Sequence, residues 1–279
     1  MPYRKYGQSF RNLRLQHHLS QKYFEKIGIS AAMLSVFENG KSMISFDKLD
    51  DMLQEMNVTL FDYSIMVNDG EAGSFLKVFS DIENLSYKYD RKKLNAIYED
   101  YNQYSGNEKL IALSAKSHYA PLTPEEIKIV ENYLEEVKYW GIFELLVLEN
   151  TMTSINSALL KKIAENFWDF KKYYASTIEY KMLVMRIITK ATLRFIADRN
   201  KVLSELMLER IKSLQSPADA TSGVYLKFLQ GDYIYIFDNK VKGRAEMRAA
   251  VQILKQLGMK ELFVVFRNYY YQITHANHA

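Results

Sequence analysis

Cysteine is absent from this chain of 279 residues, and glycine and proline are scarce, at 11 and 4 residues. Without cysteine there are no disulfides, thiolate metal ligands, cysteine nucleophiles or thiol redox sensors. No apolar run approaches the roughly 20 residues that a transmembrane helix needs, and the charged start MPYRKYGQSFRNLRLQ lacks the apolar segment of a signal peptide. The sequence therefore predicts a cytoplasmic protein without a membrane segment.

The residues that are present favour helix. Hydrophobic residues make up 48% of the chain, which is enough to fill substantial cores, and the length exceeds that of most single domains. Leu, Ile, Met and Tyr recur at intervals of three and four residues, as they do on one face of a helix. We therefore expect an all-α protein of two domains, residues 1–69 and 70–279, joined at the polar, glycine-bearing segment 68–73.

Charge is distributed unevenly within the first domain. The whole chain carries a net charge of +4, but residues 1–41 carry +5 and residues 42–69 carry −5. A small domain polarised in this way has one face suited to a polyanion and another that a polyanion would avoid. Two ordinary solvated faces would give the same count, so charge alone does not decide between DNA and no partner.

Gly28 and Ser30 mark a turn between two helices. Glycine accepts the left-handed conformation that ends a helix in a tight turn, and serine caps the helix that follows. We expect a helix after Ser20, itself a candidate cap, and another over about 31–38 in which Met33, Leu34 and Phe37 pack inward. This arrangement is typical of a helix-turn-helix domain, whose second helix enters the major groove.

The predicted second helix carries small residues near its start. Ala31 and Ala32 allow the backbone to approach the base edges, their methyl groups can touch a thymine methyl, and the Ser35 hydroxyl can donate or accept a hydrogen bond. Gly40 is expected to end the helix, which leaves Lys41 free to reach a phosphate.

One long motif identifies a family. The run Ser30-x4-Ser35-x-Phe37-Glu38-Asn39-Gly40-Lys41-Ser42-x-Ile44-Ser45-x3-Leu49-x3-Leu53 resembles the DNA-binding domain of the Rgg/GadR/MutR-type regulators of Gram-positive bacteria, and the resemblance covers about residues 5–66. These regulators belong to the XRE, or phage-repressor-like, superfamily. Two departures are that Val36 replaces a residue that is usually basic and that the segment 21–28 is one residue short.

The motif and the local pattern together give a candidate DNA-binding set, in which Glu38 is expected to be structural. For some members a simpler role stays open: Ser30 would only cap a helix, and Arg11 or Arg14 would pair with Glu38 instead of phosphate. The candidate DNA-binding residues are Arg11, Arg14, Gln21, Ser30, Ala31, Ala32, Ser35, Asn39 and Lys41.

Beyond residue 70, helical segments recur in pairs at intervals of very roughly 35 to 45 residues, the size of a TPR-like unit. Thr123-Pro124-Glu125-Glu126 has the composition of a helix start. The family resemblance implies the same layout: a TPR-like array that binds a short imported signalling peptide. A concave helical array suits an extended peptide.

A helix expected over about 177–197 carries the best candidates for peptide contact. Cations at intervals of four residues along it can hold a peptide carboxylate, and nearby tyrosines offer amphipathic contact surface. Solvated charges and ordinary packing would give the same pattern. The candidate peptide-binding residues are Tyr173, Tyr174, Tyr180, Arg186, Lys190 and Arg194.

Signatures of catalysis are missing. The sequence has no P-loop, dinucleotide glycine pattern or nucleophile elbow, and its five histidines are scattered, so we expect no enzyme, no cofactor and no metal site. The leading hypothesis is a homodimeric, sequence-specific transcriptional regulator that binds double-stranded promoter DNA and responds to a short hydrophobic peptide. The alternative is a peptide-responsive scaffold that acts through a protein partner, with the helix-turn-helix as a tether.

Overall fold

The computed structural model describes residues 3–70, 73–167, 178–216 and 219–275, and its described part is helical, without strands. The chain divides into two compact units, Met1–Val78 and Phe79–Ala279, which we call unit 1 and unit 2. The all-α prediction is confirmed. The expected domain boundary at residue 69 falls in the connection after the last complete helix of unit 1, and the division between the compact units falls nine residues later, inside a helix.

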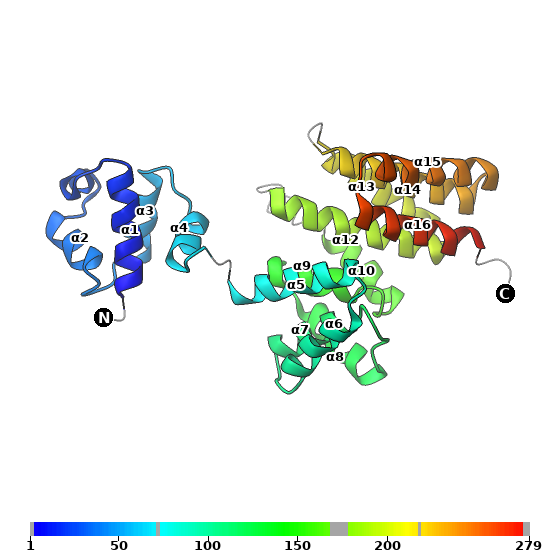
Figure 1. Cartoon of the computed structure of the whole chain (residues 1–279), viewed down its shortest axis with the longest axis horizontal. Helices are drawn as coiled ribbons and strands as arrows, with labels where there is room; N and C mark the ends of the chain where they lie inside the picture. The colour runs from blue at the N-terminus through cyan, green and yellow to red at the C-terminus, as the bar shows by residue number, and fades with distance from the viewer. Residues whose placement is uncertain (1–2, 71–72, 168–177, 217–218, 276–279) are drawn as a thin grey trace. The chain divides into compact units, whose positions relative to one another are not determined.

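Unit 1 is a bundle of short helices (Figure 1). The second of them is a 3₁₀ helix, which advances further per residue than an α-helix and so fits the shortened segment before Gly28. In chain order the helices are α1 (Arg4–Gln16), η1 (Gln21–Ile27), α2 (Ala31–Glu38), α3 (Phe46–Gln54) and α4 (Leu60–Val67).

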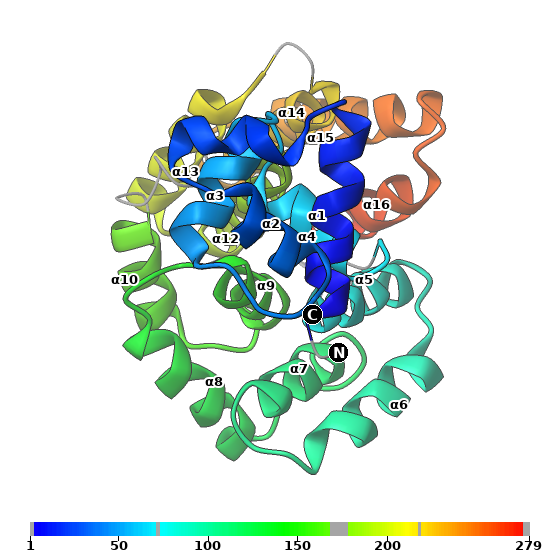
Figure 2. The same cartoon turned by 90° about the vertical axis from the view of Figure 1, so that its left-hand side faces the viewer.

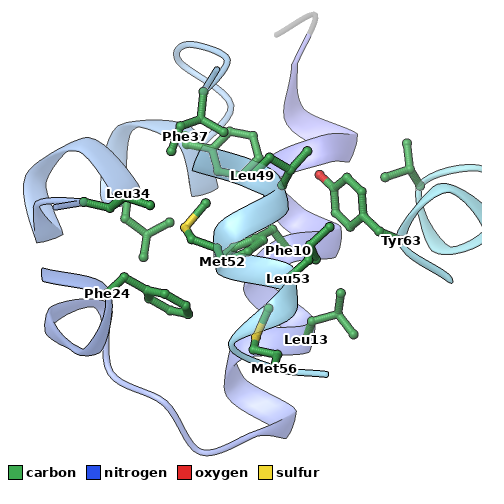
Figure 3. Packing of buried hydrophobic residues seen from close by; sticks show 13 residues of the cluster. Phe10, Leu13, Phe24, Leu34, Phe37, Leu49, Met52, Leu53, Met56 and Tyr63 are labelled. Carbon is green, nitrogen blue, oxygen red and sulfur yellow. The ribbon is translucent and has the colours of Figure 1, made fainter. Parts of the chain in front are cut away.

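An apolar core holds these helices together (Figure 3). Phe10 on α1 lies at its centre, with ring centroids 5.8 Å from Phe24 and 5.7 Å from Phe37, so one side chain joins α1, η1 and α2. Full burial of each such ring contributes about 1.5–3 kcal/mol. The buried members are Phe10, Leu13, Phe24, Ile29, Leu34, Phe37, Ile44, Leu49, Met52, Leu53, Met56, Tyr63 and Val67.

Two sequence predictions for this core are wrong. Met33 was expected to pack inward but is 39% exposed, because Leu34 and Phe37 already occupy the inner face of α2. Ser20 was expected to cap the second helix, yet its side chain accepts no capping hydrogen bond at the start of η1.

Glycines let α1 and α2 touch through their backbones. A Cβ at Gly7 would lie 2.0 Å from the carbonyl oxygen of Phe37, and one at Gly40 would lie 2.5 Å from the Cα of Arg4. Both distances are impossible for a real side chain. The end of α2 is therefore held against α1 at a separation that only glycine permits.

The helices from α5 onward build the rest of the chain. Figure 2 shows those of unit 2 following one another along an arc, from α6 and α7 through α8 and α10 to α13 and α15. They are α5 (Ser74–Tyr87), α6 (Arg91–Asn102), α7 (Asn107–Lys116), α8 (Pro124–Glu136), α9 (Ile142–Thr151), α10 (Ser157–Phe167), α12 (Ile178–Ala197), α13 (Lys201–Leu214), α14 (Ala220–Phe237), α15 (Lys240–Gln256) and α16 (Lys260–His275).

Sequential helices of unit 2 pack as pairs, as a TPR-like array requires: α6 on α7, α12 on α13, and α14 on α15. The start of α8 was read correctly, since Thr123 and Glu126 form a capping box and Pro124 stands in the first turn. At the far end, Phe266 of α16 stacks on Tyr225 at 5.0 Å and meets Phe228 edge-on at 4.9 Å. These rings bring the last helix back onto α14, so that α16 lies over the inner side of the array.

Candidate functional site

The turn between η1 and α2 has the predicted geometry. Gly28 adopts a left-handed conformation with φ of 79°, and its amide bonds to Glu25 at the end of η1. Two residues later the Ser30 hydroxyl accepts a hydrogen bond of 3.2 Å from the amide of Met33. The cap is confirmed, and this use of the Ser30 side chain fixes where α2 begins.

Backbone bonds also define the end of α2. Gly40, with φ of 68°, donates its amide to Phe37, and Lys41 donates to Val36 over 3.0 Å. These two bonds form a Schellman motif, which satisfies the last carbonyls of the helix. Asn39 adds a side-chain bond, since its Nδ2 donates to the carbonyl oxygen of Ser35 over 2.7 Å. The Lys41 side chain is left exposed beyond the helix end.

The solvent side of α2 contains all the small residues that the sequence proposed for base contact. Ala32 is exposed, and Ala31 and Ser35 are half-buried. Arg11 lies exposed on α1, where it shares a shallow hollow with Asn39. The candidate residues that the structure leaves accessible to a ligand are thus Arg11, Ala31, Ala32, Ser35 and Lys41.

Arg14 requires a correction. Its guanidinium is buried and donates to both carboxylate oxygens of Glu38, from Nε at 2.6 Å and from Nη2 at 2.8 Å, while Nη1 donates to the carbonyl of Leu19 at 2.7 Å. Arg14 therefore does not contact a phosphate, because its guanidinium already donates its hydrogen bonds to groups inside the unit. The bond to Glu38 raises the pKa of Arg14 and keeps it charged.

Gln21 completes this network. Its Nε2 donates to Oε2 of Glu38 over 2.8 Å, so the amide is tied to the end of α2. Glu38 is structural, as expected, and joins α1, η1 and α2 through one carboxylate. The outer positive charge comes instead from exposed side chains such as Arg11, Lys22 and Lys41.

Unit 2 contains a cavity of about 340 Å³ on the inner side of its array. Its wall comes from α5, α9, α12, α14 and α16, so helices far apart in the sequence meet around it. Asn268 on α16 donates to the hydroxyl of Tyr89 over 3.1 Å and joins two sides of the opening. The charged and polar lining includes Glu83, Tyr87, His118, Glu149, Asn150, Arg186, Thr189 and Lys190.

Glu149 is the buried acid of this cavity. Lys190 bonds its carboxylate at 2.6 Å and its backbone carbonyl at 3.0 Å, and Nε of Arg186 lies 3.5 Å from the same carboxylate. Burial acts to raise the pKa of Glu149, but the charges of Lys190 and Arg186 outweigh it and hold that pKa below its usual value. Two cations thus face one buried anion. Glu83 approaches Arg186 only at 3.7 Å, from a more exposed position.

Unpaired polar groups lie beside these charges. Thr189 is buried and its hydroxyl has no hydrogen-bond partner among the described residues, and the same holds for Nε of Arg186. His118 pairs with the Asn150 side chain at 2.5 Å, and burial lowers the pKa of this histidine, so its imidazole is neutral at pH 7. The cavity therefore offers unused donors next to two cations, of which Arg186 is only loosely paired, at 3.7 Å from Glu83 and 3.5 Å from Glu149.

The predicted peptide-binding residues divide into three groups. Arg186 and Lys190 line the cavity. Arg194, one turn further along α12, instead pairs with Asp198 at 3.2 Å and donates to Thr153, and Tyr180 is not part of the lining. Tyr173 and Tyr174 lie outside the described residues. Sequence reasoning missed Glu149, on a mostly apolar helix, and His118, in the turn after α7, because isolated residues of this kind carry no distinctive pattern.

No described helix combines the length and apolarity needed to span a bilayer. Within the same residues, no three His, Asp or Glu side chains come together as metal ligands.

Two family models match the chain. The model for the C-terminal domain of the HTH-type transcriptional regulator Rgg matches residues 83–268, and a helix-turn-helix model matches residues 10–63. The first covers most of unit 2 and the second covers α1 to α4 apart from their outer ends.

Solved structures share the fold over nearly the whole chain. A protein from Listeria monocytogenes EGD-e has a TM-score of 0.80 at 18% identity, with 98% of each chain covered. The Streptococcus dysgalactiae SHP pheromone receptor Rgg2 has a TM-score of 0.75 at 23% identity, with 96% of this chain and 99% of that one covered. PrgX in its complex with cCF10 gives 0.67 at 13% identity, with 97% and 92% covered. The family match and the shared architecture agree: this chain belongs to the Rgg family of helix-turn-helix transcriptional regulators.

Proposed function

We propose that this regulator is a cytoplasmic homodimer that binds a pseudo-palindromic promoter site through α2 of unit 1 and responds to a short peptide held in the cavity of unit 2. The observation that carries the peptide proposal is the pairing of the buried Glu149 with the partly exposed Arg186 and Lys190, with the unpaired Thr189 hydroxyl beside it.

The chemistry of the cavity favours a peptide carboxylate. Glu149 is the one buried anion beside Arg186 and Lys190, and Glu83 approaches Arg186 only at 3.7 Å from a half-exposed position. A peptide carboxylate can take the place of Glu83 and accept charge-assisted hydrogen bonds from Arg and Lys. The aromatic side chains of Tyr225, Phe266 and Tyr269 supply apolar wall around it. A volume of about 340 Å³ suits the end of a peptide and a few side chains, with the rest extending along the array.

The structural neighbours support the same class of ligand. Rgg2 is a pheromone receptor, and another similar structure is a bacterial peptide pheromone/receptor complex, with a TM-score of 0.64 at 12% identity. Both share the fold that encloses the cavity here.

Dimerisation follows from the size of unit 1. One helix of eight residues makes few base contacts, so two copies on half-sites roughly 34 Å apart are needed for selective binding. Each copy brings its own phosphate-directed cations, and counterion release makes such binding sensitive to salt.

Calorimetry of the full chain tests the peptide proposal. Short hydrophobic peptides encoded beside the gene are titrated with a free C-terminal carboxylate and, as the matched control, with a C-terminal amide. We expect binding of at least one free acid and at least tenfold weaker binding of its amide, since the amide loses the charge-assisted contacts. Failure of all peptides to bind would contradict the proposal.

Gel shifts with the promoter of the chain's own operon, over a range of salt concentrations, test the DNA proposal separately. We expect a selective complex whose affinity falls steeply with salt. A promoter response that persists in a variant unable to bind DNA would favour the protein-partner alternative.

A further inference from the structure

The side chains of α2 bring no accessible charge to its solvent side, and the ammonium of Lys48 on α3 lies 3.7 Å from the Met33 sulfur. Glu38 is the only charged residue of this helix, and it is 3% exposed and bonded to Arg14 and Gln21. The strongest specific contact in the major groove is a bidentate bond from Arg or Lys to guanine. No side chain of α2 can make that contact.

The amides nearest to this face are already used. Asn39 donates to the main chain at Ser35 over 2.7 Å, which turns its side chain back along the helix, and Gln21 donates to Glu38 over 2.8 Å. A bidentate contact with adenine requires a free Asn or Gln amide. Ser35 is left as the polar side chain of α2 available for a base edge, and one hydroxyl discriminates poorly between bases.

Apolar side chains occupy the same face instead. Met33 is 39% exposed and Val36 is 40% exposed, beside the exposed Ala32. Two further apolar side chains, Met43 and Phe46, are exposed in the segment that leads into α3. An exposed apolar surface of this kind marks a contact site.

The major groove presents one apolar group that such a surface can read, the 5-methyl group of thymine. The exposed cations Arg11, Lys22 and Lys41 of the same unit supply the attraction to phosphates that brings DNA to it. Positive charge and apolar contact therefore have separate sources in unit 1: the phosphate-directed charge comes from outside α2, and the apolar contacts come from α2 itself.

We infer that this regulator selects its operator by thymine methyl groups, and that Ala32, Met33 and Val36 are the specificity-determining residues. The inference rests on the proposed insertion of α2 into the major groove. Burial of one methyl group against an apolar side chain corresponds to about a fourfold gain in affinity. The gains from several such contacts in each half-site of a dimer multiply, so the affinity for a site with correctly placed thymines exceeds the affinity for other sequences.

Deoxyuridine substitution tests the inference directly, because deoxyuridine pairs like thymidine and lacks only the methyl group. Binding sites are first selected from random duplex DNA with the full chain, and each thymine of a selected site is then replaced in turn. We expect replacement at two or three positions of each half-site to weaken binding about three- to tenfold, and replacement at the other positions to leave it within twofold.

Variants then assign the contacts to side chains. At one position of the selected site, Val36→Ala should bind duplexes with thymine and with deoxyuridine equally well, and Met33→Ala should do the same at one position. Each variant should still bind thymine more tightly than deoxyuridine at the remaining positions. Phe61→Ala, which removes a side chain that is 59% exposed on α4 of the same unit, is the matched control and should keep every discrimination. Circular dichroism confirms that the variants are folded, which the exposure of these side chains leads us to expect.

The outcomes separate the inference from the proposed function. A selected site that binds equally well when all its thymines are replaced would overturn the inference and leave DNA binding intact, as would discrimination unchanged in both α2 variants. Failure to select any sequence would overturn the DNA-binding proposal and the inference together.

Discussion

Units 1 and 2 bury charge in opposite ways. In unit 1 Arg14 donates two hydrogen bonds to Glu38 and one to the carbonyl of Leu19, and Gln21 also donates to Glu38. The hydrogen bonds of this network are therefore made within the unit, and we call it closed. In unit 2 Glu149 faces two cations beside a cavity, where Thr189 has a hydroxyl without a partner.

The difference separates positioning from binding. A closed network in a packed core holds helices in one arrangement and offers nothing to a ligand. An open network costs stability, because unpaired buried donors lose their hydrogen bonds to water, and a ligand that supplies the missing acceptors recovers that loss. The first network therefore fixes the helix that we propose inserts into DNA, and the second is suited to a regulator's ligand.

Breaking the closed network should have the largest effect. Glu38→Gln leaves Arg14 buried without a counter-charge, which we expect to cost unit 1 about 3–5 kcal/mol of stability. Hydrogen exchange of the amides of α1 and α2 measures this loss. Glu55→Gln is the control, since Glu55 pairs with Lys26 at the surface at 2.5 Å, and its removal should leave exchange close to wild type. Equal exchange in both variants would show that the buried pair does not hold α2.

Asp232 on α14 is another buried acid. Its Oδ1 has no hydrogen-bond partner among the described residues, and burial raises its pKa from 3.8 to about 7. The folded state thus keeps a proton that the unfolded state has lost, so the stability of unit 2 should fall as pH rises from about 4 to about 7 and stay low above that. Asp232→Asn removes this dependence and should stabilise unit 2 by up to about 4 kcal/mol at pH 8.

Urea unfolding followed by tryptophan fluorescence measures the effect of Asp232→Asn, because both tryptophans of the sequence lie in unit 2. The difference between variant and wild type should shrink toward pH 4. A difference that does not change with pH would show that Asp232 is already compensated in the folded state.

Thr189→Val tests the open network at nearly constant volume. The variant loses the unpaired hydroxyl, so we expect peptide affinity to fall about three- to tenfold while thermal stability stays equal or rises slightly. Thr192→Val is the matched control on the same helix, because the Thr192 hydroxyl bonds the Ile188 carbonyl and does not line the cavity. Equal affinities of the two variants, measured by calorimetry, would place the peptide elsewhere.

Glu83→Gln should give the smallest effect, and in the opposite direction. Glu83 competes with a ligand carboxylate for Arg186 from a half-exposed position at 3.7 Å. Its removal should strengthen binding of a free-acid peptide about two- to fivefold and leave binding of the amide unchanged. Weaker binding of the acid would show that Glu83 holds Arg186 in place for the ligand.

Sequence reasoning succeeded where the chemistry is local. Gly28 and Ser30 specify a turn and a cap through their own backbone and side chain, and Gly40 ends α2 in the same way. The motif from Ser30 to Leu53 led to the family that the comparisons confirm.

It was less successful for contacts between distant residues. Arg11 and Arg14 are both basic residues of one helix, and only the position of Glu38, 24 residues later, buries Arg14 and leaves Arg11 outside. The pairing of Lys190 with Glu149 spans 41 residues and depends on how α9 packs on α12. Periodicity identifies a helix face but not the partner that will cover it, which is also why Met33 was placed in the core.

The contact between Gly40 and Arg4 has a practical consequence for work on this protein. Because Arg4 at the start of α1 packs on Gly40 at the end of α2, an affinity tag joined ahead of α1 would lie beside the surface that we assign to DNA. Such a tag would weaken operator binding by steric exclusion alone, and purified protein should have it removed before any affinity is measured.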